Sequence, residues 1–77
     1  MLPTMGHLRD PKLLKQVATR IRDLRTGKGI TLEEFYNDTG IHLARIESSQ
    51  GNVTVSTLNH ICRYFGLTLE DFFKGIN

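Results

Sequence analysis

The sequence contains no tryptophan, one cysteine and two prolines among its 77 residues. Cys62 alone cannot form an intramolecular disulfide, which fits a reducing compartment, and we expect a cytoplasmic protein. The chain has no apolar run near the roughly 18 residues of a membrane-spanning helix, and no secretory leader is recognisable. So short a chain has room for one core only. Most catalytic sites need a cleft between two parts of a protein, and we do not expect such a cleft in so short a chain.

The small net charge of +2 conceals an uneven distribution. Residues 1–30 carry seven Lys or Arg and two Asp, a net charge of +5, whereas residues 31–77 carry three Lys or Arg and six acids, a net charge of −3. A basic half on a small domain suits nucleic acid or another polyanion, and it equally suits a solvated helix face. The cations that we interpret as a solvated face of the first helix are Lys12, Lys15, Arg20 and Arg22.

Asp10 and Pro11 predict the start of a helix, because aspartate caps a helix N-terminus and proline fits its first position. Apolar residues then recur at helical spacing at Leu13, Leu14, Val17, Ile21 and Leu24. Gly27 or Gly29 is expected to end this helix, since glycine adopts a left-handed cap at low cost. The helix should span about residues 11–26. The sequence thus divides into an N-terminal arm at 1–10 and a helical domain at 11–77.

A pattern of seven residues occurs twice, as GITLEEF at 29–35 and as GLTLEDF at 66–72. In each copy a glycine closes one helix, a threonine caps the next, and an acid three residues later can complete a capping box. The acid is glutamate in the first copy and the shorter aspartate in the second. The repeat therefore predicts two sharp helix-to-helix corners, with helices beginning at Leu32 and Leu69.

Two more helices fit between these corners. Asp38 or Thr39 can cap a helix at about 39–48, with Leu43 and Ile46 facing inward. A further helix has its cap and buried stripe at Thr54, Val55, Leu58, Ile61, Cys62 and Phe65. The sequence therefore predicts an all-α fold of five short helices around one core.

The last helix holds two adjacent aromatic residues, Phe72 and Phe73. Neighbouring positions on a helix cannot both point fully inward, so one ring is expected to remain exposed. Such a ring is either an edge of the core or part of an apolar dimer patch.

Several segments carry a family resemblance, in this order: IRDLR at 21–25, GITLEEF at 29–35, ARIE at 44–47, and TL at 57–58 followed by YFGLTLEDFF at 64–73. Together they resemble the Cro and repressor-type (XRE-like) helix-turn-helix DNA-binding family over about residues 12–73. The resemblance implies a lambda-repressor-like domain. Its third helix, at about 39–48, would lie in the major groove of double-stranded DNA.

The resemblance also implies the residues of the interface. The helix that begins at Leu32 would point its N-terminus at a phosphate, and the outer face of the third helix would read base edges, with Arg45 on guanine. The loop after that helix would meet the DNA backbone. The implied DNA-binding residues are Thr31, Leu32, Thr39, Gly40, Ile41, His42, Ala44, Arg45, Ser48, Gln50 and Asn52.

Arg25 and Glu47 have a different implied role. The family pairs an arginine of the first helix with a glutamate that closes the third. We therefore expect a structural ion pair between Arg25 and Glu47, which fixes the third helix against the first.

The resemblance implies a small transcriptional regulator, a repressor or controller, that acts as a homodimer on a palindromic operator. No enzyme, metal or cofactor is predicted, because His60 and Cys62 face different sides of one helix and no nucleophile lies near a base.

An alternative function is a protein-interaction or antitoxin-like module on the same fold. It is favoured by Leu32, where family members often carry glutamine. It is also favoured by a stretch from Thr31 to Glu47 that is about three residues, nearly one helical turn, shorter than usual.

Overall fold

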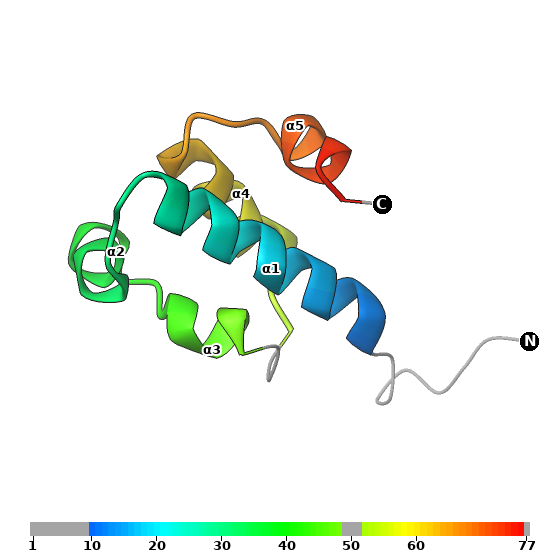
Figure 1. Ribbon diagram of the computed structural model, residues 1–77, viewed down its shortest axis with the longest axis horizontal. Helices are drawn as coiled ribbons and strands as arrows, with labels where there is room; N and C mark the ends of the chain where they lie inside the picture. The colour runs from blue at the N-terminus through cyan, green and yellow to red at the C-terminus, as the bar shows by residue number, and fades with distance from the viewer. Residues whose placement is uncertain (1–9, 49–51, 77) are drawn as a thin grey trace, which may run out of the picture.

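The computed structural model describes residues 10–48 and 52–76. In these ranges its regular secondary structure consists entirely of helices. Its helices are α1 Pro11–Gly27, α2 Leu32–Thr39, α3 Leu43–Glu47, α4 Val55–Tyr64 and α5 Leu69–Lys74. Figure 1 shows α1 crossing the middle of the molecule, with α3 on one side of it and α5 on the other. Contacts join α1 to α3, α2 to α3, and α4 to α5. The predicted all-α fold is confirmed. Residues 1–9 of the predicted arm lie outside the described ranges.

The first helix begins and ends where local chemistry requires. The Asp10 carboxylate accepts a hydrogen bond from the Leu13 amide at 3.0 Å, as a cap should. At the other end Gly29 has a φ of +68°, and the Ile30 amide donates to the Arg25 carbonyl at 3.1 Å. This is the left-handed helix ending that favours glycine. Of the two candidate glycines, Gly29 therefore makes the turn and Gly27 stays within α1.

Both copies of the repeat form the predicted corner. In the first, the Thr31 hydroxyl accepts from the Glu34 amide and the Glu34 carboxylate accepts from the Thr31 amide, each at 3.0 Å. In the second, the Thr68 hydroxyl accepts from the Asp71 amide at 3.0 Å. Helices α2 and α5 begin at Leu32 and Leu69, as predicted.

The corners deliver two phenylalanines to the core. Phe35 and Phe72, each in the first turn or just beyond it, are completely buried. The Phe35 ring lies 4.6 Å from the Tyr64 ring and 5.8 Å from the Phe65 ring, measured between centroids, so it joins α2 to the end of α4. The remaining buried apolar residues of this core cluster are Val17, Ile21, Leu43, Leu58, Ile61 and Cys62.

Val55, which was predicted to be buried, is exposed, and so is Leu13 of the apolar stripe on α1. Val55 is 72% exposed and Leu13 is 41% exposed. Each lies in the first turn of its helix, ahead of the point where the helix meets the core. The prediction was wrong because helical spacing shows which residues share a face and does not show where along the helix that face becomes covered. Phe73 is 42% exposed, so the expectation that one of the paired phenylalanines faces outward is confirmed.

Cys62 offers a direct check of the core. Its burial raises the pKa of the thiol above the ordinary value. The folded state therefore favours the neutral thiol, and it loses stability as the pH rises above the ordinary thiol pKa of about 8.5. We expect alkylation of Cys62 by iodoacetamide at pH 8 to be about 1,000-fold slower in the folded protein than in urea-unfolded chain, since opening must come first. Equal rates, measured by mass spectrometry, would contradict the packing of α4.

Candidate nucleic-acid interface

Helix α3 presents one side to the core and the other to solvent. On the inner side Leu43 and Glu47 are only 1% and 8% exposed, and Ile46 packs against the core cluster. On the outer side Ala44 and Arg45 are exposed. The predicted inward orientation of Leu43 and Ile46 is confirmed, and the outer side of α3 is open to a ligand.

The predicted start of this helix was wrong. Residue 39 belongs to α2, which ends at Gly40 with a φ of +76°, and α3 begins only at Leu43. The Thr39 hydroxyl donates to the Phe35 carbonyl at 2.8 Å and accepts from the Ile41 amide at 3.1 Å, so it closes α2 and does not cap α3. The helix predicted at 39–48 is therefore a turn at 40–42 followed by a helix of five residues.

Asp38, the other candidate cap, is used elsewhere. Its carboxylate accepts a hydrogen bond from the Tyr64 hydroxyl at 2.6 Å, which ties the end of α2 to α4. The same hydrogen bond raises the pKa of Tyr64. His42 stands at the cap position of α3 and makes no capping bond through its side chain.

The turn at 40–42 is nevertheless held in place. The His42 ring stacks on the Tyr36 ring of α2, with centroids 4.3 Å apart and planes inclined by 26°. Ile41 is partly buried and packs against the core. The turn is thus fixed to α2 on one side and to the core on the other, which compensates for the missing cap.

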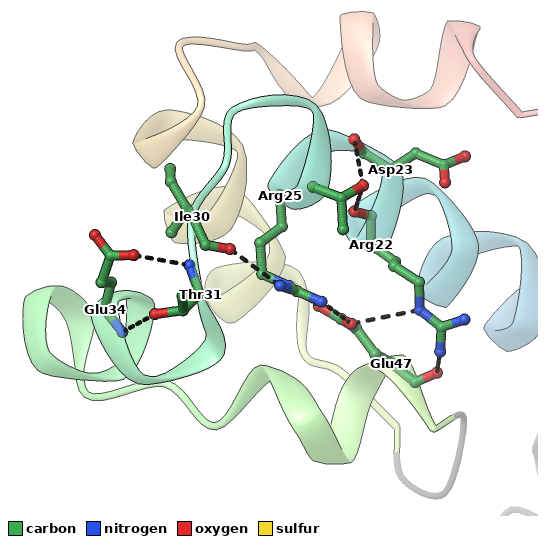
Figure 2. Close-up of polar contacts among 8 residues, drawn as sticks. Arg22, Asp23, Arg25, Ile30, Thr31, Glu34 and Glu47 are labelled. Carbon is green, nitrogen blue, oxygen red and sulfur yellow. Dashed lines mark hydrogen bonds and ion pairs between the residues drawn. The ribbon is translucent and has the colours of Figure 1, made fainter.

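Glu47 anchors the other end of α3. The Arg25 guanidinium donates to both carboxylate oxygens of Glu47, from Nε at 2.8 Å and from Nη2 at 3.0 Å. Its remaining nitrogen, Nη1, donates to the Ile30 carbonyl at 3.0 Å. Figure 2 shows this one guanidinium linking α1, the corner before α2, and α3. The ion pair expected from the sequence is present.

The environment of this pair favours the charged form of Arg25. The hydrogen bond to Glu47 raises the pKa of the Arg25 guanidinium, while burial acts in the opposite direction. The Glu47 side chain is 6% exposed and that of Arg25 is 14% exposed. A bidentate, charge-assisted contact with so little water around it fixes distance and orientation together.

Two further arginines of α1 have partners that the sequence analysis missed. Arg22 approaches Glu47 from the side opposite Arg25, with its Nε 3.5 Å from the carboxylate and its Nη2 3.4 Å from the Glu47 carbonyl. Arg20 donates to the carbonyls of Phe72 at 3.2 Å and Asp71 at 3.3 Å, in α5. The interpretation of Arg20 as a member of a solvated face was wrong, because Arg20 is partly buried against α5. Arg22 is exposed, as expected of such a face, and it contacts Glu47 as well. The signal for Arg22 was its spacing of three residues from Arg25, which places both on one side of a helix.

The N-terminus of α2 is a poorer anion site than expected. Thr31 and Leu32 are exposed there, but the capping box already places the Glu34 carboxylate on the Thr31 amide. Glu33 adds a second acid to the same turn. Two carboxylates repel an incoming phosphate at the helix end that would otherwise attract it.

The predicted DNA-binding residues fall into two groups. A surface hollow is lined by four of them, Ile41, His42, Arg45 and Asn52, together with Ile46. Ala44 and Ser48 are exposed on the same short helix and at its end, and Thr39 and Gly40 lead into the turn before it. Thr31 and Leu32 lie at the far end of α2 from these residues. Gln50 lies outside the described residues.

Other kinds of site are not evident in residues 10–48 and 52–76. These ranges hold no group of three or more His, Cys, Asp or Glu side chains placed to bind a metal ion. They also include no helix of the length and apolarity that crossing a membrane requires.

Comparison with protein families gives a match over residues 20–76, to a family model described as the Cro/C1-type HTH DNA-binding domain. The matched segment begins within α1 and includes all four later helices, and with them Arg22, Arg25 and Glu47. Searches of curated proteins and of solved structures gave no significant match.

Proposed function

The chain belongs to the Cro/C1-type helix-turn-helix DNA-binding family, and from that premise we propose that it is a sequence-specific transcriptional regulator, a repressor or controller. Double-stranded DNA is the ligand that this membership assigns. In the proposal, α3 and the turn before it enter the major groove, and the outer side of α3 reads base edges.

One observation carries the proposal: the inner side of α3 is fixed against the rest of the domain, and its outer side is exposed to solvent. Leu43 and the Arg25–Glu47 ion pair hold its inner side, while Ala44 and Arg45 face solvent. A base-reading element must hold its side chains in register with the groove, which a loose five-residue helix alone would not do. The ion pair supplies that constraint.

Specific roles follow from side-chain chemistry. Arg45 has the fork geometry for the two acceptors of guanine in the major groove, and Ile41 and Ala44 offer apolar contact to thymine methyl groups. In the proposal, Ser48 and Asn52 contact the DNA backbone. The full proposed interface is Thr31, Leu32, Thr39, Gly40, Ile41, His42, Ala44, Arg45, Ser48, Gln50 and Asn52.

Selection from random duplex DNA tests the proposal. The protein should enrich a palindromic motif, and its affinity for that motif should fall linearly on a plot of log affinity against log salt. A duplex of scrambled sequence serves as the control. If no motif is enriched, or if the salt response is flat, the proposal fails.

The same experiment separates the second candidate, a protein-interaction module on the same fold. The observation that favours it is the acidic first turn of α2, with Glu33 and Glu34 beside the exposed Leu32. A module of this kind would show neither retention on duplex DNA nor motif enrichment, and it would instead retain a protein partner.

The proposal includes a homodimer on a palindromic operator, with the two α3 helices about 34 Å apart. A groove with mainly apolar lining supports a second copy as the partner. It lies on α1, α4, α5 and residues 52–53, and it shares Asn52, but no residue of α3, with the proposed DNA interface. Its lining residues are Asp10, Leu13, Leu14, Val17, Asn52, Val53, Val55, Leu58 and Phe73. An apolar groove with exposed rings and methyl groups is typical of a surface that another protein covers.

Phe73→Ser tests the dimer. Since removing a phenylalanine from an apolar contact costs about 1.5–3 kcal/mol, the dissociation constant of the dimer should rise at least about tenfold. Analytical ultracentrifugation measures this. Tyr36→Ser is the matched control, because Tyr36 is 44% exposed, similar to the 42% of Phe73, and lies on α2 away from the groove. A dimer that survives in the Phe73 variant, or a wild-type protein that stays monomeric, would exclude this face.

A further inference from the structure

We infer that Arg22 is a phosphate contact that extends the DNA interface from α3 onto α1; this inference rests on the proposed DNA-binding function. The guanidinium groups of three arginines of α1 lie in three different environments. Arg20 lies on the backbone carbonyls of α5. Arg25 donates a hydrogen bond from each of its three side-chain nitrogens, to Glu47 and Ile30. Arg22 is the one whose side chain is mostly exposed, at 58%.

The contacts of Arg22 are long and leave most of its hydrogen-bonding capacity free. Its Nε lies 3.5 Å from the Glu47 carboxylate, whereas Arg25 reaches that carboxylate at 2.8 Å. Arg25 already donates to both carboxylate oxygens. An arginine has five N–H donors, and an exposed arginine at such a long distance from its partner contributes little to stability. Arg22 is therefore held near Glu47 without being needed to neutralise it.

The charge balance at this place favours an anion. Two guanidinium groups share one carboxylate, which leaves one positive charge at the C-terminal end of α3 (Figure 2). The Nη2 of Arg22 lies 3.4 Å from the Glu47 carbonyl, so this charge is next to the end of the proposed base-reading helix. Planar guanidinium groups bind phosphate in a two-point geometry.

The rest of the interface needs such a cation. The N-terminus of α2, which the family resemblance assigns to a phosphate, carries Glu33 and Glu34 in its first turn. On α3 the single cation is Arg45, which the proposal assigns to a base. Arg22 supplies backbone affinity on the same side of the molecule, since the helix that carries it packs directly on α3.

The test compares Arg22→Gln with wild-type protein on the duplex enriched by selection. The slope of log affinity against log salt should become about 0.9 less steep, which is the contribution of one phosphate contact. Preference among base sequences should stay the same, because phosphate contacts do not read sequence. Lys74→Gln, which removes one charge from exposed α5, is the matched control and should leave the slope unchanged.

Two more measurements make the outcome decisive. Arg22→Lys keeps the charge and should keep the wild-type slope, and the thermal midpoint of Arg22→Gln should stay within a few degrees of wild type. An unchanged slope in Arg22→Gln overturns the inference, as does an Arg22→Lys variant that behaves like Arg22→Gln. If the wild-type protein itself shows no salt-dependent duplex binding, the proposed function fails first, so the two failures are distinguishable.

Discussion

Replacing Glu47 with alanine should destabilise the protein by about 3 kcal/mol, the lower end of the usual cost of removing one partner from a buried ion pair. The variant leaves the Arg25 guanidinium, 14% exposed in the native protein, without its carboxylate. Arg25 keeps only the Ile30 carbonyl at 3.0 Å. The loss is large because α3 has five residues and no side-chain cap, so it has little stability of its own.

Urea unfolding followed by circular dichroism measures this effect. For a small domain stable by about 5 kcal/mol, the loss of about 3 kcal/mol lowers the urea midpoint to about 40% of the wild-type value. Asp23→Ala, which removes an exposed acid from α1, is the control and should change stability by at most about 0.5 kcal/mol. A Glu47 variant as stable as the Asp23 variant would show that α3 does not depend on this ion pair.

Replacing Arg45 with alanine should remove base discrimination without affecting the fold. A bidentate contact from arginine to guanine accounts for about 1–3 kcal/mol of discrimination, or roughly 5- to 150-fold in relative affinity. Arg45 is exposed, and it takes part in none of the ion pairs found in residues 10–48 and 52–76. The change should therefore be confined to DNA binding.

Competition between the selected site and versions with one base pair replaced measures the discrimination. Wild type should distinguish the guanine that Arg45 contacts, and Arg45→Ala should bind both versions almost equally. Arg63→Ala, which removes an exposed arginine from α4, controls for loss of charge. Weakening of all sites by the same factor in the Arg45 variant would make Arg45 a phosphate contact.

The corners of the fold were predictable because their causes are local. A glycine with positive φ, a threonine cap and an acid three residues later are all within seven residues of sequence, and their hydrogen bonds do not depend on distant contacts. The structure therefore starts α2 and α5 at the predicted residues, Leu32 and Leu69.

The start of α3 was not predictable in the same way. Thr39 is a good cap by residue type, but its hydroxyl completes the last turn of α2 at 2.8 Å from the Phe35 carbonyl. Asp38 is likewise a good cap that pairs instead with Tyr64, 26 positions later. The choice between a local cap and these alternatives depends on where Gly40 turns the chain and on how α4 packs. Neither can be read from the spacing of residues.

For the candidate site, the sequence identified the ion pair through the family resemblance but missed the second arginine. Both Arg22 and Arg25 point to the α3 side of α1. Only the distances show that Arg25 binds the Glu47 carboxylate closely, at 2.8 Å, whereas Arg22 approaches it to 3.5 Å. Similarly, Val55 and Leu13 differ from their buried neighbours by position along a helix and not by residue type.

If a braced α3 offers its outer side to DNA, amide chemical-shift mapping should locate the contact there. Isotopically labelled protein would be titrated with the selected duplex. The largest shift changes are expected at residues 39–48, at Asn52 and at Arg22, with little change around Leu13, Val55 and Phe73 in a protein that is already dimeric. Changes confined to the groove on α1, α4 and α5, with residues 39–48 unaffected, would show that α3 does not bind the duplex.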